Sequence, residues 1–338
     1  MTASTLNLYP LLFEPALHTK VWGGRQLETR LGKALPADQP IGESWEIYWE
    51  NRVANGEFRG KTLGELIATY PEAMVGNVTA DPEFPLLIKL LDAQDWLSVQ
   101  VHPDDKLAAE LEGQPRGKTE CWYIVDAAPD SQIVYGFSQA TDAVGFRHAI
   151  ESGTAKEMLQ FVNVAPGDFI YVPAGTMHAI GPGLLIYELQ QTSDTTYRVY
   201  DWDRMGLDGK PRDLHIDKSL KVTHYDVRPT AKVNYPQEAP QSISMLIANP
   251  YFTLNKISLK QGKVIIDYRA EGIHAPSYTL TVTKGDITLS SLSQPENTTH
   301  LTLGQSAFMP SQIGAYQIGA DQDSEALMAL VGDRRSLE

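Results

Sequence analysis

The chain has 338 residues, a formal net charge of −14 and a hydrophobic share of 42%. Its length favours two domains over one, and its composition is that of ordinary globular proteins rather than disordered or membrane-embedded ones. Nucleic-acid backbones are bound by clustered Lys and Arg, and the sequence has no such run, so a nucleic-acid partner is not expected. A small phosphorylated molecule stays compatible with this charge if cations gather around its site.

The beginning of the chain lacks the basic residues and the continuous apolar run of a secretory signal, and no later apolar stretch approaches ~18 residues. We therefore expect a cytoplasmic protein without a membrane partner. The single cysteine, Cys121, cannot form an internal disulfide or a cysteine-based zinc site, and it is predicted to be a small buried hydrophobic residue. Any metal must then be held by His, Glu, Asp or Gln.

Short runs of alternating or β-branched residues recur along the chain between turn residues, and they predict a mainly β protein. Helices are predicted over Thr62 to Tyr70, ended by Pro71, over Asp104 to Leu111, and in segments within Asp142 to Leu159. We expect these few helices to lie at the periphery of the sheets.

The segment from Trp96 to His102 is predicted to be a strand with two different faces. Its alternation places Ser98, Gln100 and His102 on one face and apolar residues on the other. Polar groups on an otherwise buried strand are costly unless they are paired or coordinate an ion. The alternative is a polar stripe that faces solvent.

The next predicted strand, from Lys118 to Ile124, places Lys118 and Glu120 on a common face. A cation and a carboxylate therefore point in the same direction. The alternative is an exposed ion pair of little energetic value, which is common on surface strands.

A third segment, Gly167 to His178, has the pattern G-x5-P-x-G-x2-H, in which Pro173 and Gly175 form a turn before His178. This pattern matches the second motif of the cupins at each fixed position up to the histidine. By that resemblance the earlier strands correspond to the first cupin motif, in which a His-x-His pair and a later Glu are replaced by Gln100-x-His102 and Glu120. The resemblance implies that Gln100, His102, Glu120 and His178 are metal ligands.

Two imidazoles, a carboxylate and an amide oxygen suit Zn²⁺, and Mn²⁺, Co²⁺ or Fe²⁺ would also fit. Five other histidines lack this context and are predicted to be ordinary core or surface residues. They are His148, His215, His224, His274 and His300.

The glutamine among the ligands resembles the type I mannose-6-phosphate isomerases in particular. Three further motifs agree with this family: Gly117 to Glu120, Pro173 to His178, and Ser193 to Arg198, in collinear order within residues 10 to 220. The resemblance implies that Arg198 and Lys118 project into the active site. It also implies that Lys89 and Ser98 bind a substrate phosphate. The alternative for Lys89 is that it pairs with another anion or extends to water.

The proton-transferring group stays open at this point. Glu188, Lys118 and a zinc-bound water are the candidates. Glu188 lies in the apolar run Leu184 to Leu189, where burial would raise its pKa. The alternative for Glu188 is a hydrogen bond to Arg198 or to a ligand histidine.

The motif Gly167 to Pro173 has a counterpart in Gly304 to Pro310, which indicates a duplicated β unit. Where His178 would recur stands Ala315, so the second unit is predicted to be a metal-free cupin. We expect two cupin, or jelly-roll β-barrel, modules with a few peripheral helices: residues 1–235 with the metal site, and residues 236–338.

The expected activity is a zinc-dependent aldose–ketose isomerisation of mannose 6-phosphate and fructose 6-phosphate through an enediol, in a monomer or homodimer whose partner is a small sugar phosphate. The alternatives are another metal-dependent cupin enzyme and a non-catalytic sugar-binding cupin. The segment Tyr48 to Arg52 departs from the small polar residues that the resemblance implies there, and this leaves the range of sugars open.

Overall fold

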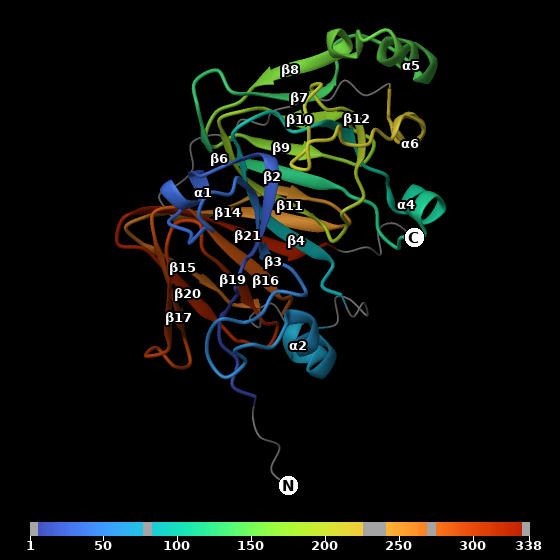
Figure 1. Cartoon of the computed structure of the whole chain (residues 1–338). Helices are drawn as coiled ribbons and strands as arrows, with labels where there is room; N and C mark the ends of the chain where they lie inside the picture. Colours follow the sequence, from blue (N-terminus) through green and yellow to red (C-terminus); the bar gives the residue numbers. More distant parts are fainter. Residues whose placement is uncertain (1–5, 77–82, 226–240, 269–274, 333–338) are drawn as a thin grey trace. The chain divides into compact units, whose positions relative to one another are not determined.

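The computed structural model describes residues 6–76, 83–225, 241–268 and 275–332 and divides the chain into two compact units (Figure 1). Unit 1 comprises Met1–Ala16, Glu46–Leu87 and Tyr235–Glu338, and unit 2 comprises Leu17–Trp45 and Ile88–Asn234. The predicted boundary between residues 235 and 236 falls within 226–240, outside the described residues, and stays a prediction. Within the described ranges, no helix combines the length and apolar character needed to cross a membrane.

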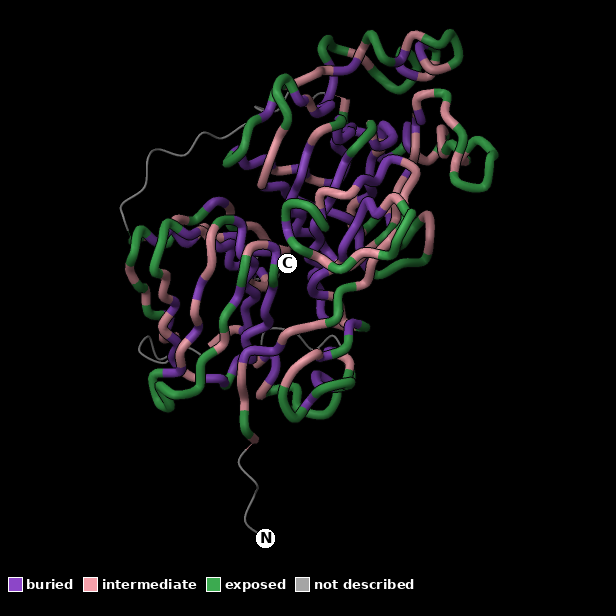
Figure 2. Tube along the Cα trace, turned by 60° about the vertical axis from the view of Figure 1, so that its left-hand side comes forward, coloured by how far each residue is buried: buried purple, intermediate pink, exposed green. Residues whose placement is uncertain are grey.

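Unit 2 contains two sheets, with the strand orders β2-β3-β4-β11-β6-β9 and β12-β5-β10-β7-β8. Their strands are β2 (Ala16–Gly24), β3 (Ile41–Ile47), β4 (Leu86–Ala93), β5 (Val99–Val101), β6 (Glu120–Ala127), β7 (Gln132–Phe137), β8 (Leu159–Asn163), β9 (Phe169–Val172), β10 (His178–Ile180), β11 (Leu184–Gln191) and β12 (Tyr197–Tyr200). Figure 2 shows buried residues along the strands and exposed residues concentrated in the connections.

The core of unit 2 lies between its two sheets and is apolar over part of its length. Trp122 of β6, Leu91 of β4 and Ile186 of β11 belong to this core, together with Tyr135 and Ile180 of the other sheet. Because side chains alternate along a strand, residues two positions away point to the same interior. The interior positions next to Leu91, Trp122 and Ile186 are therefore occupied by Lys89, Glu120 and Glu188. One end of the interior is apolar, and the other end carries charges.

The helices of unit 2 are α1 (Gln26–Thr29), α4 (Asp105–Glu112), α5 (Ala143–Glu151), η1 (Ala155–Met158) and α6 (Ile216–Val222). Most of them pack on the outer face of its five-stranded sheet, whereas α1 follows β2 and contacts Asp92 of β4 in the six-stranded sheet. Phe146 of α5 and Leu220 of α6 join Val99 and Val101 of β5 in a second apolar cluster. The apolar face of β5 is thus covered by helices, so its polar face must turn toward the interior.

The predicted helices are confirmed in both units, and local capping explains their bounds. In unit 1, α2 (Leu63–Thr69) begins at a capping box in which Thr62 and Glu65 exchange side-chain and backbone hydrogen bonds. Asp104 caps α4, and Gly113 closes it at a φ of 66°. Pro71 stands at the start of a further helix, α3 (Pro71–Met74). The short helices α1, α3 and α6 were not predicted.

Unit 1 contains a six-stranded sheet, β1-β19-β16-β21-β14-β13, and a four-stranded sheet, β15-β20-β17-β18. Its strands are β1 (Leu11–Leu12), β13 (Gln241–Ala248), β14 (Phe252–Lys260), β15 (Lys263–Ile266), β16 (Tyr278–Lys284), β17 (Ile287–Ser291), β18 (Thr298–Leu301), β19 (Ser306–Met309), β20 (Tyr316–Gly319) and β21 (Asp323–Val331). Leu280, Leu289 and Ile318 join its core from both sheets.

The repeated motif marks the same structure in both units. Gly167 and Gly304 have φ values of 89° and 79°, and each precedes a strand, β9 or β19, that pairs antiparallel with β6 or β16. The residue before the motif proline lies opposite Glu120 in unit 2 and opposite Tyr278 in unit 1. Tyr278 of unit 1 thus occupies the position in the strand register that Glu120, a predicted metal ligand, occupies in unit 2. The predicted fold class, a mainly β chain of two cupin modules with few helices, is confirmed.

Candidate active site

Strand register brings three of the predicted site residues into one row across the five-stranded sheet. Gln100 of β5 lies directly opposite His178 of β10 on one side and Arg198 of β12 on the other. Residues directly opposite each other in a sheet share a face. All three side chains therefore leave the sheet on the side opposite the helices. Ser98 and His102 are 3% and 1% exposed, so the solvent-facing alternative for this strand is wrong.

His102, Glu120 and His178 converge in the interior, with one ligand atom of each within 4.8 Å of the others. Nε2 of His102 lies 3.6 Å from Oε2 of Glu120, and Nε2 of His178 lies 3.4 Å from Oε1. The opposite ring nitrogens face backbone oxygens: Nδ1 of His102 lies 3.0 Å from the oxygen of Thr195, and Nδ1 of His178 lies 2.9 Å from that of Thr176. These oxygens fix the protons on Nδ1.

Each Nε2 atom therefore presents a lone pair toward a carboxylate. Burial, followed by the charge of Lys118, holds the pKa of His102 well below its ordinary value, and burial lowers the pKa of His178 to about 4. Both rings are neutral at physiological pH. Nε2 of His102 is buried without a hydrogen-bond partner among the described residues. Three acceptors that face one another in this way fit a divalent metal ion.

Gln100 and Lys118 border this cluster. Nε2 of Gln100 lies 3.3 Å from Nε2 of His178, and Nζ of Lys118 lies 3.1 Å from Oε2 of Glu120. The side chains of Lys118 and Glu120 are 6% and 1% exposed. The exposed-pair alternative for these two residues is therefore wrong.

Lys89 is buried and lies between two carboxylates. Its Nζ is 3.3 Å from Oε1 of Glu188 and 3.6 Å from Oε2 of Glu43, and Glu43 also pairs with Lys20 at 2.8 Å. Although burial raises the pKa of Glu43, Lys89 and Lys20 together bring it well below its usual range. Burial lowers the pKa of Lys89, but the charges of Glu43 and Glu188 keep it above its ordinary value. Glu43 and Lys89 are therefore both charged at neutral pH.

Glu188 differs from Glu43 because burial dominates its behaviour. Burial, and next the charge of Glu120, raise its pKa, while Lys89 and Lys118 act in the opposite direction. Nε1 of Trp122 donates to Oε2 of Glu188 at 3.0 Å. Among the described residues, Lys89 and Trp122 are its polar partners, and neither Arg198 nor a ligand histidine bonds it, which contradicts the predicted alternative.

A cavity of about 250 Å³ lies within unit 2, and two of its lining residues, Gln100 and Lys118, contact the cluster of His102, Glu120 and His178. Five cations line it in a chain of net charge −14: Lys20, Lys89, Lys118, Arg198 and Arg212. The expectation that cations gather around the site agrees with this lining. Ser98, Gln100 and Glu188 also line the cavity.

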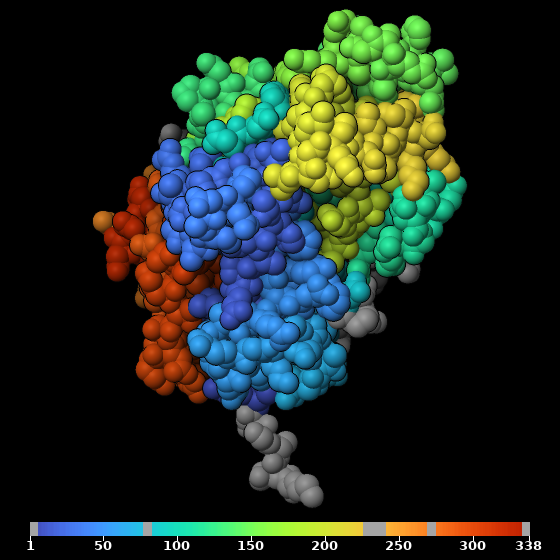
Figure 3. All heavy atoms as spheres, in the orientation of Figure 1, coloured from blue at the N-terminus to red at the C-terminus, as the bar shows by residue number. Residues whose placement is uncertain are grey.

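Arg198 reaches the cavity from β12 and is held by the segment that follows this strand. Its Nη1 donates to the backbone oxygen of Asp213 at 2.9 Å, and burial followed by the charge of Arg212 lowers its pKa. Arg212 is held by Asp201 through a contact of 2.6 Å from its Nε. Figure 3 shows the segment after β12, in yellow, on the surface of the molecule.

Sequence reasoning assigned no role to several residues that line the cavity. Glu43 carried a usable signal, because it is a charged residue inside the buried strand β3, as Lys89 is in β4. Asp194 stands within the motif Ser193 to Arg198, of which only Arg198 was assigned. Lys20 and Arg212 lie in segments without a distinguishing pattern.

Comparison with known proteins identifies relatives of the whole fold. Residues 11–132 match the family model described as phosphomannose isomerase type I, catalytic domain. The mannose-6-phosphate isomerase of Streptococcus mutans is 42% identical over 251 residues, which are 73% of this chain and 78% of the relative. Mannose-6-phosphate isomerase ManA of Bacillus subtilis is 43% identical over 265 residues, 75% of this chain and 82% of the relative.

Solved structures agree with these sequence matches. The crystal structure of the mannose 6-phosphate isomerase from Bacillus subtilis has a TM-score of 0.84 and 32% identity, and the match covers 95% of this chain and 99% of that one. The structure of a putative mannosephosphate isomerase from Archaeoglobus fulgidus has a TM-score of 0.76 at 19% identity, which supports the fold alone. The chain therefore belongs to the type I mannose-6-phosphate isomerases, a family of enzymes, and the resemblance found in its motifs is confirmed.

Proposed function

We propose that this chain is a zinc-dependent aldose–ketose isomerase that interconverts mannose 6-phosphate and fructose 6-phosphate. The observation that supports this proposal most is that two neutral imidazoles and a carboxylate lie next to a cavity lined by Lys89, Lys118 and Arg198, with Lys118 in contact with Glu120. A metal-binding group alone would suit many cupins, whereas the added cations suit an anionic sugar. The names of the relatives supply the particular sugar phosphate.

Gln100, His102, Glu120 and His178 are the proposed metal ligands. The amide oxygen of Gln100 would reach the same centre if its amide group turned by 180°, which exchanges the positions of Oε1 and Nε2. Nitrogen and oxygen donors without a thiolate suit Zn²⁺. When bound, the ion supplies a Lewis acid that polarises the sugar oxygens.

Isomerisation requires that the C2 proton leave, that an enediol form, and that a proton return to C1. We assign the transfer to Glu188, because it lines the cavity and burial raises its pKa above the ordinary value, which makes its carboxylate a stronger proton acceptor. Arg198 stabilises the negative charge that develops on the sugar oxygens. Lys118, held by Glu120, donates a hydrogen bond to the sugar.

Lys89 and Ser98 stay the proposed phosphate ligands, since both line the cavity. Lys89 already contacts Glu188 and Glu43, so phosphate binding there would loosen these pairs. An alternative within the same proposal is that Lys89 serves Glu188 by tuning its pKa. Lys89→Met separates the two roles: a phosphate ligand raises KM for the sugar phosphate, whereas a partner of the proton-transferring group displaces the pH profile of kcat.

The test of the proposal uses purified protein loaded with Zn²⁺ in a coupled assay that detects fructose 6-phosphate formed from mannose 6-phosphate. Treatment with a chelator should abolish turnover, and Zn²⁺ should restore it. A loaded protein that binds mannose 6-phosphate without turning it over would support a non-catalytic sugar-binding cupin instead.

Two variants separate metal binding from the reaction. Glu120→Gln should lower both zinc content and turnover, because it removes the carboxylate that faces both imidazoles. Arg198→Lys should keep its zinc while kcat falls by about 100-fold, the cost of losing one oxyanion-stabilising donor. Full turnover in Arg198→Lys would remove Arg198 from the mechanism.

A further inference from the structure

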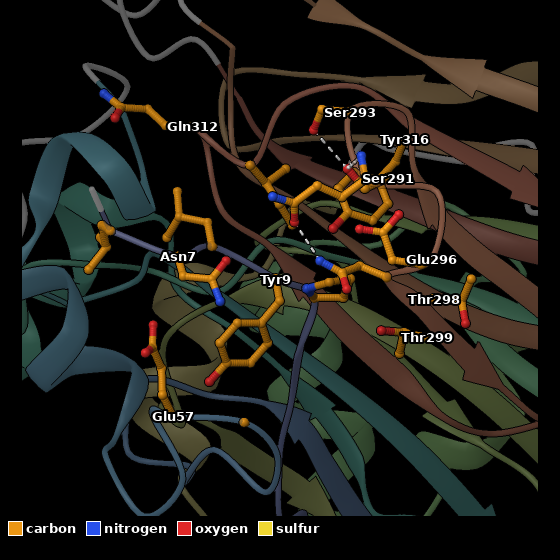
Figure 4. A pocket seen from close by; sticks show the side chains of 17 residues that line it. Asn7, Tyr9, Glu57, Ser291, Ser293, Glu296, Thr298, Thr299, Gln312 and Tyr316 are labelled. Atoms are coloured by element: carbon orange, nitrogen blue, oxygen red, sulfur yellow. Dashed lines mark hydrogen bonds between the residues drawn. The ribbon is translucent and has the colours of Figure 1, made fainter. Parts of the chain in front are cut away.

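A second cavity, within unit 1, has no role in the proposed isomerisation. Its volume is about 460 Å³, within the range of small-molecule sites. Figure 4 shows its two sides: the N-terminal segment and the loop of Glu57 on one, and the turns around Ser291 and Tyr316 on the other. Segments far apart in the sequence therefore build this cavity.

The first side of the cavity is held by several hydrogen bonds. The hydroxyl of Tyr9 accepts from the backbone nitrogen of Phe58 at 2.8 Å and donates to the backbone oxygen of Asn55 at 3.2 Å. The side chain of Asn55 in turn bonds the backbone of Leu12 and Pro10. The N-terminal segment is thus fixed against the loop that carries Glu57.

A glycine allows this close approach. Gly56 has a φ of 57°, and a Cβ atom on it would lie 2.3 Å from Cζ of Tyr9. A larger residue at this position would push the Tyr9 ring out of place.

The second side is ordered by its own polar contacts. The hydroxyls of Ser291 and Ser293 lie 3.0 Å apart, and Ser291 also accepts from the backbone nitrogen of Gln294. Tyr316 lies behind them and is 2% exposed. These groups are engaged with one another and form a frame.

Other polar side chains of the cavity are not engaged in this way. Six polar side chains that line the cavity make no side-chain hydrogen bond to any described residue. They are the amides of Asn7 and Gln312, the carboxylates of Glu57 and Glu296, and the hydroxyls of Thr298 and Thr299. Figure 4 shows these side chains on both sides of the open space. A ligand would therefore meet donors and acceptors that no protein group has satisfied.

The charge of the lining decides the class of ligand. Glu57 and Glu296 are its only ionisable groups besides two tyrosines, and no Lys, Arg or His is among the described lining residues. A phosphorylated sugar would be repelled by the two carboxylates. Amides and hydroxyls offer both donors and acceptors, and carboxylates accept strongly from hydroxyl groups. This combination complements a molecule that carries many hydroxyl groups and no charge.

We propose that this cavity of unit 1 binds a neutral saccharide of one or two sugar units, separately from the sugar-phosphate site of unit 2. The ligand hydroxyls would bond the amides of Asn7 and Gln312 and the carboxylates of Glu57 and Glu296. The ring of Tyr9 lines the cavity as an apolar surface for the sugar.

The test is calorimetric titration of the full chain with maltose, cellobiose and mannobiose, compared with putrescine and inorganic phosphate. The proposal expects millimolar binding of at least one disaccharide. The double variant Asn7→Leu/Gln312→Leu should weaken that binding at least tenfold. The variant Glu120→Gln of the other unit should leave it unchanged.

The matched control is Gln317→Leu. Gln317 follows Tyr316 in β20, and its side chain lines a different cavity of unit 1. Urea midpoints of all variants check that unit 1 is folded. The proposal is overturned if no disaccharide binds at a ligand concentration 50-fold above 1 mM, or if only putrescine or phosphate binds. It is also overturned if Gln317→Leu weakens binding as much as the double variant does.

Discussion

The pairing of Lys89 with two buried carboxylates predicts a pH-dependent loss of stability when the lysine is removed. In Lys89→Met, Glu43 keeps Lys20 at 2.8 Å, so its charge stays compensated. Glu188 loses its cation at 3.3 Å and keeps only the hydrogen bond from Trp122. An uncompensated buried charge costs about 3–5 kcal/mol of the free energy of unfolding, but a carboxyl group avoids this cost by taking up a proton.

The sign of the pH dependence follows from the pKa of Glu188. Burial already raises it in the folded state, and loss of Lys89 raises it further. A folded protein that holds more protons than the unfolded chain loses stability as pH rises above the unfolded pKa of about 4.3. We expect Lys89→Met to lose about 3–5 kcal/mol at pH 8 and less, about 1–2 kcal/mol, at pH 5, because proton uptake by Glu188 removes more of the charge cost at the lower pH.

Urea unfolding of the metal-free protein at pH 5 and pH 8 measures this difference. Lys20→Met is the matched control, because its side chain is 31% exposed and its loss should cost only about 1 kcal/mol at both pH values. The reasoning is refuted if Lys89→Met costs the same free energy at both pH values, or more at pH 5.

Three further predictions concern single contacts. Trp122→Phe removes the donor to a buried carboxylate and should lower the free energy of unfolding by about 1–3 kcal/mol. Gly175→Ala places a Cβ atom 2.6 Å from Nδ1 of His224 at a φ of 84°, and it should lower zinc affinity measured by competition with a chelator. Its control is Gly209→Ala, which has a φ of 74° and open space around it and should keep the zinc affinity unchanged. Thr62→Ala removes a capping box and should cost about 1 kcal/mol in urea unfolding.

Strand parity predicted from the sequence which polar residues share a face, and the resemblance to cupins then named the proposed metal ligands among them. A period of two fixes which residues of one strand share a face, and the buried Ser98 and His102 agree with the predicted polar face of β5. The turn at Pro173 and Gly175 was also visible, because these residue types restrict the backbone locally. Local rules were therefore sufficient for this part of the site.

The partners of Lys89 were not predictable, because they depend on which strands become neighbours. Glu43 and Glu188 are 145 residues apart in the sequence, yet both contact the same ammonium group. No local pattern encodes that pairing. The short helix α6 escaped prediction for a related reason, since its Leu220 and Val222 are stabilised by packing on the sheet rather than by a long periodic pattern.

The two units show that chemistry is decided at a few positions of a shared scaffold. In unit 2, the strand that follows Gly167 pairs next to Glu120, and the turn after it delivers His178. In unit 1, the equivalent strand pairs next to Tyr278, and Ala315 stands where the histidine would be. Burial raises the pKa of Tyr278 far above its ordinary value, so its hydroxyl stays neutral and is a poor metal ligand. The fold is retained in both units because the turn glycine and the apolar core positions are retained. A metal site of the proposed kind requires, in addition, that charged or basic groups occupy the interior end of the strands, and only unit 2 among the described residues meets this condition.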